Sequence, residues 1–459
     1  MSMHRSILEM AQQLRQRELS PVELARDCLA RIEKLNPVLN AFITVTADSA
    51  LDQAREAELE IQRGAWRGPL HGIPIALKDL IDTAGVRTTA ASAQFKDRVP
   101  AEDAEIVRRL KKAGAVLLGK QNLHECAYGG SSIISYYGEV HNPWNTDCIA
   151  GGSSGGSAAS VAAGLCYGAI GTDTAGSVRE PAAQCGVVGL KPTYGRISVR
   201  GVIPLSLSLD HVGPITRTVS DAAVIFQAIA GHDEQDACSV DRPVDDYAAA
   251  VAKPGRFTVG IPRKFFFEDL HPEVAAAVEQ AITVLQTLGA EVREIDPDVP
   301  TDRTLQAGEA YAFHKEFVAR SPELYLPATL ERIRYGQDVT AEELEELRQE
   351  LARIRREVSA VFEQVDLLVT PAVSVPPPEI AELQRDPSLL RPRELLLLRN
   401  TRPFNVWGLP AISVPCGFTG DGLPIGLQIA GPHWGESAVL RLAHAYEQAT
   451  AWHHRQPPI

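Results

Sequence analysis

Residues 151–160 read GGSSGGSAAS and lead directly into an alanine-rich helical run at 158–163 and an apolar strand near 166–171. Glycine lets a backbone turn tightly, and a helix that begins there directs its first N–H groups outward. Short apolar runs alternate with helical patterns on both sides of this segment. The order predicts an α/β fold in which helices cover both faces of a large, mixed and twisted β-sheet. The other expected strands are residues 73–77, 115–118, 187–190, 259–261, 367–369, 412–414 and 425–429.

The composition is that of a globular enzyme, with 459 residues, of which 45% are hydrophobic and 22% are charged. A net charge of −13 argues against nucleic acid as a partner. No apolar run reaches the ~18 residues that a membrane helix needs, and the charged N-terminus is unlike a secretion signal. The seven cysteines include no CxxC pair, and HExxH is absent. We therefore expect a cytoplasmic protein that binds no membrane and no metal.

We expect one domain over residues 1–459, beginning with two helices in a segment of N-terminal helices at about 1–65. Ser20 and Glu23 form the pattern of a capping box at the start of the second helix. A core with the sequence motifs follows at about 66–260. Residues at about 300–400 are a helical insertion with a second capping box, and we expect this insertion to form the wall of a pocket. Its aromatic candidates for that wall are Tyr311, Phe313, Phe317 and Tyr325, with Phe404 and Trp407 close behind. The apolar run at 395–398 has three interpretations, namely core, which is the default for such a run, pocket lining or a dimer contact.

Lys78 ends the apolar run in HGIPIALKDL, residues 71–80. A lysine at the end of a strand usually extends its ammonium into water. The alternative is a buried lysine, whose pKa falls because burial disfavours the charged form, so that the neutral amine can act as a base.

The glycine-rich segment 151–160 has three interpretations: a flexible linker, a phosphate cradle, or a loop that bears a catalytic serine. Gly151-x-Ser153-x-Gly155 formally matches the GxSxG motif of α/β-hydrolases. That motif needs a strand directly before it, and residues 142–150 read as a turn. It also needs a histidine, for which the candidates are His211, His232, His433 and His453.

Ser177 follows a buried strand in GTDTAGSVREPAA, residues 171–183. The small residues around it allow a close approach of backbone to substrate. Successive N–H groups of such a turn can point at one oxygen, which is what an oxyanion hole requires.

Together these segments resemble the amidase signature family. The resemblance includes NPW at 142–144, CGVVGLKPTYGRIS at 185–198, SLDHVGPITRTVSDAA at 208–223, GLPAISVPCGF at 408–418 and LPIGLQIAG at 423–431. It extends from about residue 5 to 450 and is weakest at about 300–400.

The resemblance implies an acyl-enzyme mechanism without a cofactor, in which Ser177 is the nucleophile, Ser153 the bridging serine and Lys78 the base. The bridging serine of the family follows a cis peptide bond, here Gly152–Ser153. The implied oxyanion hole consists of the amides of Thr174, Ala175, Gly176 and Ser177. The implied supporting residues are Ser154, Asp173 and Arg179, and those at the substrate pocket are Ala127, Gly130 and Ser131.

Ala175 departs from the family, which usually has glycine there. If the position needs a positive φ, alanine is strained by about 1 kcal/mol or more. If it does not, the methyl group only trims the acyl pocket.

We expect a stand-alone hydrolase of small amides, anilides, carbamates or esters, monomeric or homodimeric, with a small-molecule substrate as its partner. One alternative is the glutaminase component (the A subunit) of a glutamyl-tRNA amidotransferase, which works in a complex. That component has a tyrosine-rich helical stretch where residues 331–364 here are highly charged. The others are an α/β-hydrolase esterase that uses Ser153 and a non-catalytic scaffold.

Overall fold

The structure is a computed structural model that describes residues 5–459. Its centre is one sheet of eleven strands, and a two-stranded ribbon lies apart from it. The sheet strands are β1 (Phe42–Val45), β2 (Pro74–Lys78), β3 (Val116–Gln121), β6 (Gly168–Asp173), β7 (Val188–Lys191), β8 (His211–Thr216), β9 (Thr258–Ile261), β10 (Glu291–Glu294), β11 (Leu367–Pro371), β12 (Ala411–Phe418) and β13 (Pro424–Ala430), and the ribbon strands are β4 (His141–Asn142) and β5 (Asn145–Ile149).

The strand order is β1-β3-β2-β6-β8-β7-β12-β13-β11-β9-β10, with parallel and antiparallel pairs in the same sheet. This confirms the expected mixed α/β fold. All the strands expected from the sequence are present, with ends shifted by up to a few residues. The expectation of a turn over residues 142–150 is wrong, because β4 and β5 pair there.

Helices surround the sheet, and the N-terminal segment has three of them where two were expected. Both capping boxes are confirmed, at Ser20 with Glu23 and at Thr340 with Glu343. Among residues 5–459, no helix combines the length and apolar character that crossing a bilayer needs. The helices are α1 (Ile7–Gln16), α2 (Pro21–Leu39), α3 (Ala47–Gln62), α4 (Glu105–Lys112), α5 (Gly155–Ala162), α6 (Arg179–Cys185), α7 (Val219–Ile229), α8 (Tyr247–Ala250), α9 (Arg263–Phe266), α10 (Pro272–Thr287), α11 (Thr304–Arg320), α12 (Pro327–Arg334), α13 (Ala341–Glu357), α14 (Ile380–Arg385), α15 (Pro387–Leu397), α16 (Pro403–Val406) and α17 (Glu436–Ala449).

Two glycines in β6 show how helices cover both faces of the sheet. A Cβ on Gly168 would meet Ile225 of α7, whereas one on Gly171 would meet Ser154 at the start of α5. Residues three apart in a strand face opposite sides, so α5 and α7 lie on opposite faces. Lys78 extends to the same face as α5, because its side chain contacts the turn before that helix.

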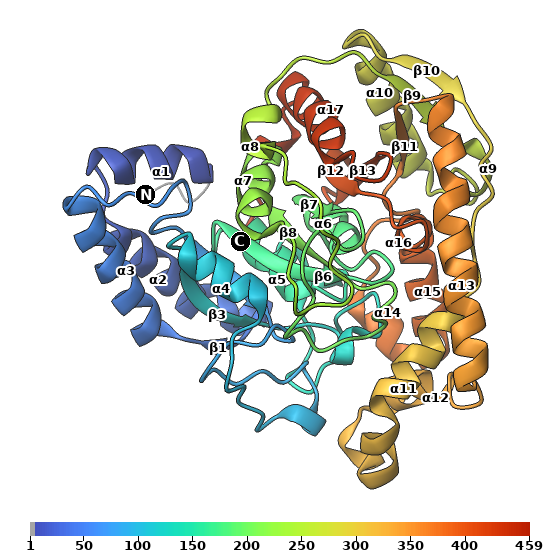
Figure 1. Ribbon diagram of the computed structural model, residues 1–459, viewed down its shortest axis with the longest axis horizontal. Helices are drawn as coiled ribbons and strands as arrows, with labels where there is room; N and C mark the ends of the chain where they lie inside the picture. The colour runs from blue at the N-terminus through green and yellow to red at the C-terminus, as the bar shows by residue number, and fades with distance from the viewer. Residues whose placement is uncertain (1–4) are drawn as a thin grey trace.

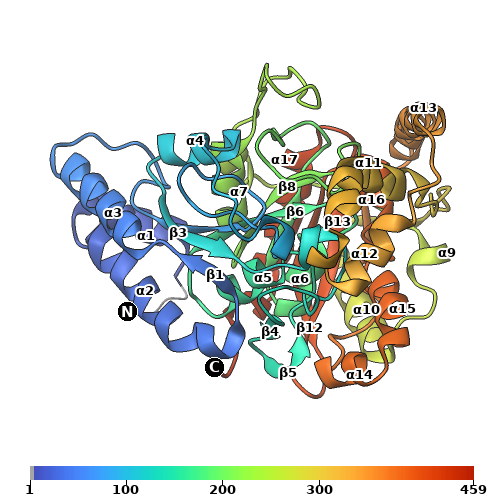
Figure 2. The ribbon, with the colours of Figure 1, turned by 90° about the horizontal axis from the view of Figure 1, so that it is seen from below.

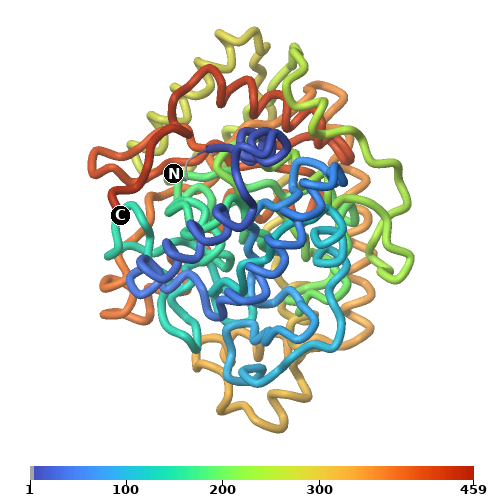
Figure 3. Tube along the Cα trace, turned by 90° about the vertical axis from the view of Figure 1, so that its left-hand side faces the viewer, coloured from blue at the N-terminus to red at the C-terminus, as the bar shows by residue number. Residues whose placement is uncertain are grey.

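The two flanks of the molecule come from distant parts of the chain. Helices α1–α3 form one flank and α11–α15 the other (Figures 1 and 2). Figure 3 shows the N-terminal helices in blue across the near side. The 300–400 insertion is therefore helical, apart from β11, and lies against the side of the core, where it can contribute to a site.

Candidate active site

Lys78 is the last residue of β2, and its side chain is completely buried. Since β2 is parallel to β6, the carboxyl ends of both strands meet at one edge. Lys78 Nζ lies 2.7 Å from Ser153 Oγ and 2.9 Å from Thr172 Oγ1. Burial lowers the pKa of Lys78 to about 7, although Asp173 and Asp210 act in the opposite direction. The solvated lysine considered from the sequence is therefore wrong, and the buried amine can accept a proton near neutral pH.

Ser153 lies in the turn before α5, and the Gly152–Ser153 peptide bond is cis, as the resemblance implies. The whole segment 151–160 is buried, which excludes a flexible linker. A Cβ on Gly152 would lie 2.8 Å from Ser132 Oγ, so a larger residue does not fit. The Gly152 N–H donates to Glu180 Oε2 at 2.6 Å, so this N–H is not available to a phosphate.

Ser154 connects the turn of Ser153 to β6 and to the turn of Ser177. Its hydroxyl donates to Thr172 O at 3.2 Å and accepts from Thr172 N–H at 3.3 Å. Its own N–H donates to Ser177 O at 3.3 Å. The two serine turns are thereby fixed relative to each other and to the strand that ends beside Lys78.

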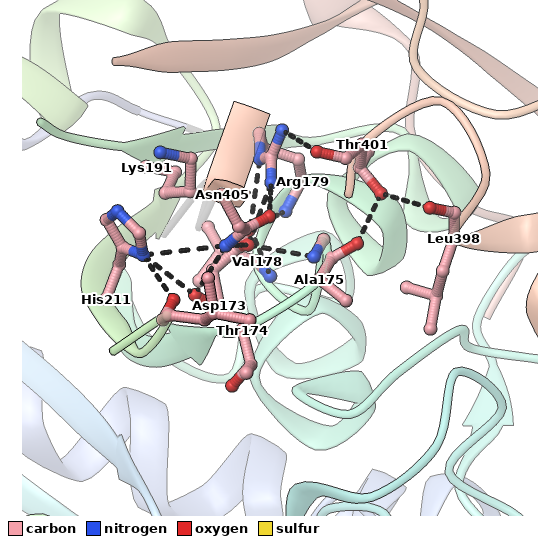
Figure 4. A network of polar contacts seen from close by, with 12 residues as sticks. Asp173, Thr174, Ala175, Val178, Arg179, Lys191, His211, Leu398, Thr401 and Asn405 are labelled. Carbon is pink, nitrogen blue, oxygen red and sulfur yellow. Dashed lines mark hydrogen bonds and ion pairs between the residues drawn. The ribbon is translucent and has the colours of Figure 1, made fainter. Parts of the chain in front are cut away.

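Asp173 ends β6 and holds the turn that bears Ser177 (Figure 4). Its carboxylate accepts from the N–H groups of Gly176 at 2.8 Å, Val178 at 3.1 Å and Arg179 at 3.3 Å. The Arg179 guanidinium adds an ion pair at 2.8 Å. Burial alone would raise the pKa of this carboxyl, but Arg179, Lys191 and Asn405 together outweigh burial and hold the pKa well below its usual range. The turn is thus anchored to a fully buried and fully bonded charge.

Residues near the end of the chain complete this anchor. The Arg179 guanidinium also donates to Gln428 Oε1 at 2.6 Å and Asn405 Oδ1 at 2.7 Å. Asn405 Nδ2 in turn donates to Asp173 O at 2.9 Å. Sequence reasoning missed both amides, and the only available signal was their position in or next to the family segments at 408–418 and 423–431.

Three of the four amides expected to form an oxyanion hole are free to do so. Within residues 5–459, the N–H groups of Thr174, Ala175 and Ser177 donate no hydrogen bond, whereas that of Gly176 is used by Asp173. Gly176 has φ +133°, and a Cβ there would lie 1.9 Å from Thr401 Oγ1. Ala175 does not have a positive φ, so its methyl group causes no backbone strain.

Of the residues expected at the substrate pocket, Gly130 is the one that Leu398 connects to this turn. A Cβ on Gly176 would be 3.1 Å from Leu398, and one on Gly130 would be 3.2 Å from it. Ala127 is buried in the same loop as Gly130. Ser131 is buried too, and its hydroxyl donates to Glu394 Oε1 at 2.7 Å, so it braces the loop.

The aromatic residues proposed for the pocket wall mostly pack elsewhere. Phe317 packs edge-to-face against Phe95 with ring centroids 5.1 Å apart, and Phe404 and Trp407 belong to a separate apolar cluster. A groove of about 390 Å³ runs beside α13 and is lined by neither Lys78 nor the two serines. Leu398 is therefore the residue of the insertion for which the structure shows contact with the nucleophile turn.

The histidine-based alternative finds no support in the geometry. No histidine within residues 5–459 hydrogen-bonds the hydroxyl of Ser153 or Ser177. His211 Nδ1 lies 2.7 Å from Leu209 O, and His433 Nε2 lies 2.8 Å from Trp407 O. Ser153 instead has the Lys78 amine beside it.

Comparison with known proteins identifies one family, by its sequence model and by individual relatives. The model of the amidase family matches residues 23–440. The A subunit of the glutamyl-tRNA(Gln) amidotransferase of Geotalea daltonii is 42% identical, over 99% of this chain and 99% of that protein. The solved 6-aminohexanoate cyclic dimer hydrolase, in complex with substrate, is 33% identical with a TM-score of 0.90, over 100% and 99% of the two chains. The solved A subunit of the same amidotransferase from Thermotoga maritima is also 33% identical, with a TM-score of 0.79 over 98% and 95%.

Proposed function

The chain belongs to the amidase family, and we propose that it hydrolyses the C–N bond of a small amide with Ser177 as nucleophile, Ser153 as proton relay and Lys78 as base. The observation that carries this proposal is the 2.7 Å contact between Lys78 Nζ and Ser153 Oγ in a fully buried environment. A lysine whose pKa lies near 7 is a competent base at neutral pH.

The reaction begins with two proton transfers. Neutral Lys78 takes the proton of Ser153, and Ser153 takes that of Ser177 as the Ser177 Oγ attacks the amide carbon. The tetrahedral oxyanion accepts hydrogen bonds from the free N–H groups of Thr174, Ala175 and Ser177.

Collapse of this intermediate breaks the C–N bond. Ser153 gives its proton to the leaving nitrogen, and Lys78 restores the proton of Ser153, which leaves an acyl ester on Ser177. Water then attacks the ester with the same relay as its base, and the carboxylic acid departs. The triad regains its starting protonation state, and the atoms of one water are divided between the acid and the amine, so no atom changes its oxidation state.

Two kinds of amide remain as substrates. The curated relatives favour the carboxamide of glutamine, cleaved by one component of an amidotransferase complex, because they carry that name at about 40% identity over nearly the whole chain. The solved structures favour a stand-alone hydrolase, since the cyclic dimer hydrolase superposes better than the amidotransferase component, with TM-scores of 0.90 and 0.79. The seven free cysteines, most of them buried, fit a reducing cytoplasm in either case.

The test is hydrolysis by the purified chain of a p-nitroanilide, a primary aryl amide, an aryl carbamate and free glutamine. Ser177→Ala and Lys78→Ala abolish turnover if the triad is correct. Ser160→Ala is the matched control, because its hydroxyl lies in α5 and bonds only Gly156 O.

The outcomes separate the candidates. Cleavage of an anilide, amide or carbamate by the chain alone supports the stand-alone hydrolase. Glutamine cleavage that appears only when the remaining amidotransferase subunits of a relative are added supports the glutaminase component. Full activity of Lys78→Ala refutes the triad in both.

A further inference from the structure

The pairing of β6 with β8 places a carboxylate opposite the first residue of the nucleophile turn. In this antiparallel pair, Asp173 at the end of β6 lies across from His211 at the start of β8. The next residues in the same register are Thr174 and Asp210, and side chains that face each other across such a pair come into contact. The Thr174 hydroxyl donates to Asp210 Oδ1 at 2.5 Å, and both side chains are buried. The Thr174 side chain extends away from Arg179 (Figure 4), so Asp210 holds the turn from a second side.

The hydroxyl is the one group of Thr174 that is bonded. Within residues 5–459, the N–H and the C=O of Thr174 take part in no hydrogen bond. The neighbouring Ala175, by contrast, is held through its C=O, which accepts from the Thr401 hydroxyl at 2.8 Å. The contact with Asp210 is therefore the only hydrogen bond in the described part of the chain that holds Thr174 in place.

Asp210 is itself fixed by its own loop, residues 205–210. Its second oxygen, Oδ2, accepts from the N–H groups of Leu205 at 2.9 Å and Ser206 at 3.1 Å. The Asp210 N–H donates to Ser206 O at 2.8 Å. The carboxylate thus has three donors and one fixed orientation, which a side chain needs if it is to hold another residue precisely in place.

The helical insertion holds this loop in turn. The buried Glu309 of α11 accepts from the hydroxyls of Ser206 and Ser208, each at 2.7 Å, and from the Ser208 N–H at 3.0 Å. Arg348 of α13 pairs with the same carboxylate at 3.0 Å. A continuous set of bonds therefore runs from two helices of the insertion to the loop that bears Asp210.

We propose that Asp210 is a positioning residue for the oxyanion hole: through the Thr174 hydroxyl it directs the Thr174 N–H at the oxygen that becomes negative. This inference rests on the proposed function. Backbone amides stabilise the transition state best when they are in place before the charge develops, so that no reorganisation is needed during the reaction. Asp210 acts through Thr174 and takes no proton in the catalytic cycle.

Steady-state kinetics on the amide that the wild type cleaves fastest separate positioning from binding. Thr174→Val is nearly isosteric and removes the hydroxyl. We expect it to lower kcat by about 10–100-fold and to leave KM within about threefold, because the N–H is misaligned only for the transition state. Thr174→Ser restores a hydroxyl and should recover most of this loss. Asp210→Ala should lower kcat at least as much as Thr174→Val.

A matched control and a double variant show whether the two side chains act through one bond. Asp233 is the control, because its buried carboxylate accepts from the Ser198 hydroxyl at 2.8 Å but, within residues 5–459, bonds no residue of the nucleophile turn. Asp233→Ala should leave kcat unchanged, even where it lowers the urea midpoint. The double variant of Thr174→Val and Asp210→Ala should have a kcat no lower than that of Asp210→Ala alone.

Labelling by a fluorophosphonate–rhodamine probe tests the turn without knowledge of the substrate. The serine oxygen bonds to phosphorus, fluoride leaves, and the phosphoryl oxygen occupies the oxyanion hole. The rate of labelling of Ser177 should fall in Thr174→Val and in Asp210→Ala, and it should return in Thr174→Ser.

The possible results distinguish a failure of this inference from a failure of the proposed function. Unchanged kcat and labelling in Thr174→Val, a loss confined to KM, or a double variant in which the two single losses multiply overturns the positioning role of Asp210. A wild type that is not labelled, or equal labelling of Ser177→Ala, overturns the proposed function instead, because Ser177 is then not the nucleophile.

Discussion

Replacing Thr172 by valine removes one of the two hydroxyl partners of Lys78 Nζ and leaves the other, Ser153, in place. Thr172 Oγ1 lies 2.9 Å from the amine and is almost completely buried, so water does not readily replace it. A hydrogen bond to a charged group is worth about 1.5–3 kcal/mol, against about 0.5–1.5 kcal/mol between neutral groups. The protonated lysine therefore loses about 1 kcal/mol more than the neutral one.

This difference sets the size and the sign of the expected change. One pKa unit corresponds to about 1.4 kcal/mol, so the pKa of Lys78 falls by about 0.7 unit from its value of about 7. Since the neutral amine is the base, kcat/KM of the wild type should rise with pH and level off above about 7. The profile of Thr172→Val should level off at lower pH.

The assay is kcat/KM of the best amide between about pH 5 and 9. Thr216→Val is the control, because Thr216 lies at the other end of the β6–β8 pair and bonds Thr218 O. If the midpoint of the pH profile of Thr172→Val is the same as in the wild type, or lies at higher pH, the reasoning is refuted that Lys78 is the titrating base and that Thr172 stabilises its charge.

Three further predictions concern the nucleophile turn, the ion pair that supports it, and a helix cap of the insertion. Gly176→Ala should reduce kcat at least about 100-fold, because the position has a positive φ and the new Cβ would clash with Thr401. Ala175→Gly should leave kcat within about threefold of the wild type, since φ there is not positive. Steady-state kinetics on the same amide measure both values. Arg179→Met leaves the buried Asp173 charge unpaired and should lower the free energy of unfolding by about 3–5 kcal/mol in urea denaturation. Thr340→Ala removes an N-cap and should cost about 1 kcal/mol of stability with activity unchanged.

The strands that could be predicted from the sequence are those with continuous apolar runs. β2, β11 and β13 are short and apolar and were found close to their true bounds. β8 was not found because Gly213 and Pro214 interrupt it, and both residues usually weaken a strand. β10 was missed because three of its four residues are charged, as suits a strand at the edge of a sheet.

The residues of the candidate site also fall into two groups, those that the sequence indicates and those that only the folded structure reveals. Lys78, Ser153 and Ser177 lie in three segments that stand out together in the sequence, and the resemblance to the amidase signature family supplied their roles. Thr172 looks in the sequence like any threonine of a strand. Its role depends on its side chain lying on the face of β6 that Lys78 contacts, which only the structure shows. Asn405 and Gln428 bond Arg179 across more than two hundred residues, a contact that only the folded chain creates.

The contacts of Arg179 have a consequence for how the enzyme is made. Its partners Asn405 and Gln428 are 226 and 249 residues further along the chain, so a ribosome has synthesised nearly the whole protein before they exist. Contacts of such long separation form late, because the intervening chain must first be ordered. A nascent chain or a fragment that ends before about residue 400 would have every member of the triad and the Asp173–Arg179 ion pair, but neither of the two amides that hold the Arg179 guanidinium. The full set of bonds around Arg179 therefore exists only once the C-terminal strands have been made and have joined the sheet.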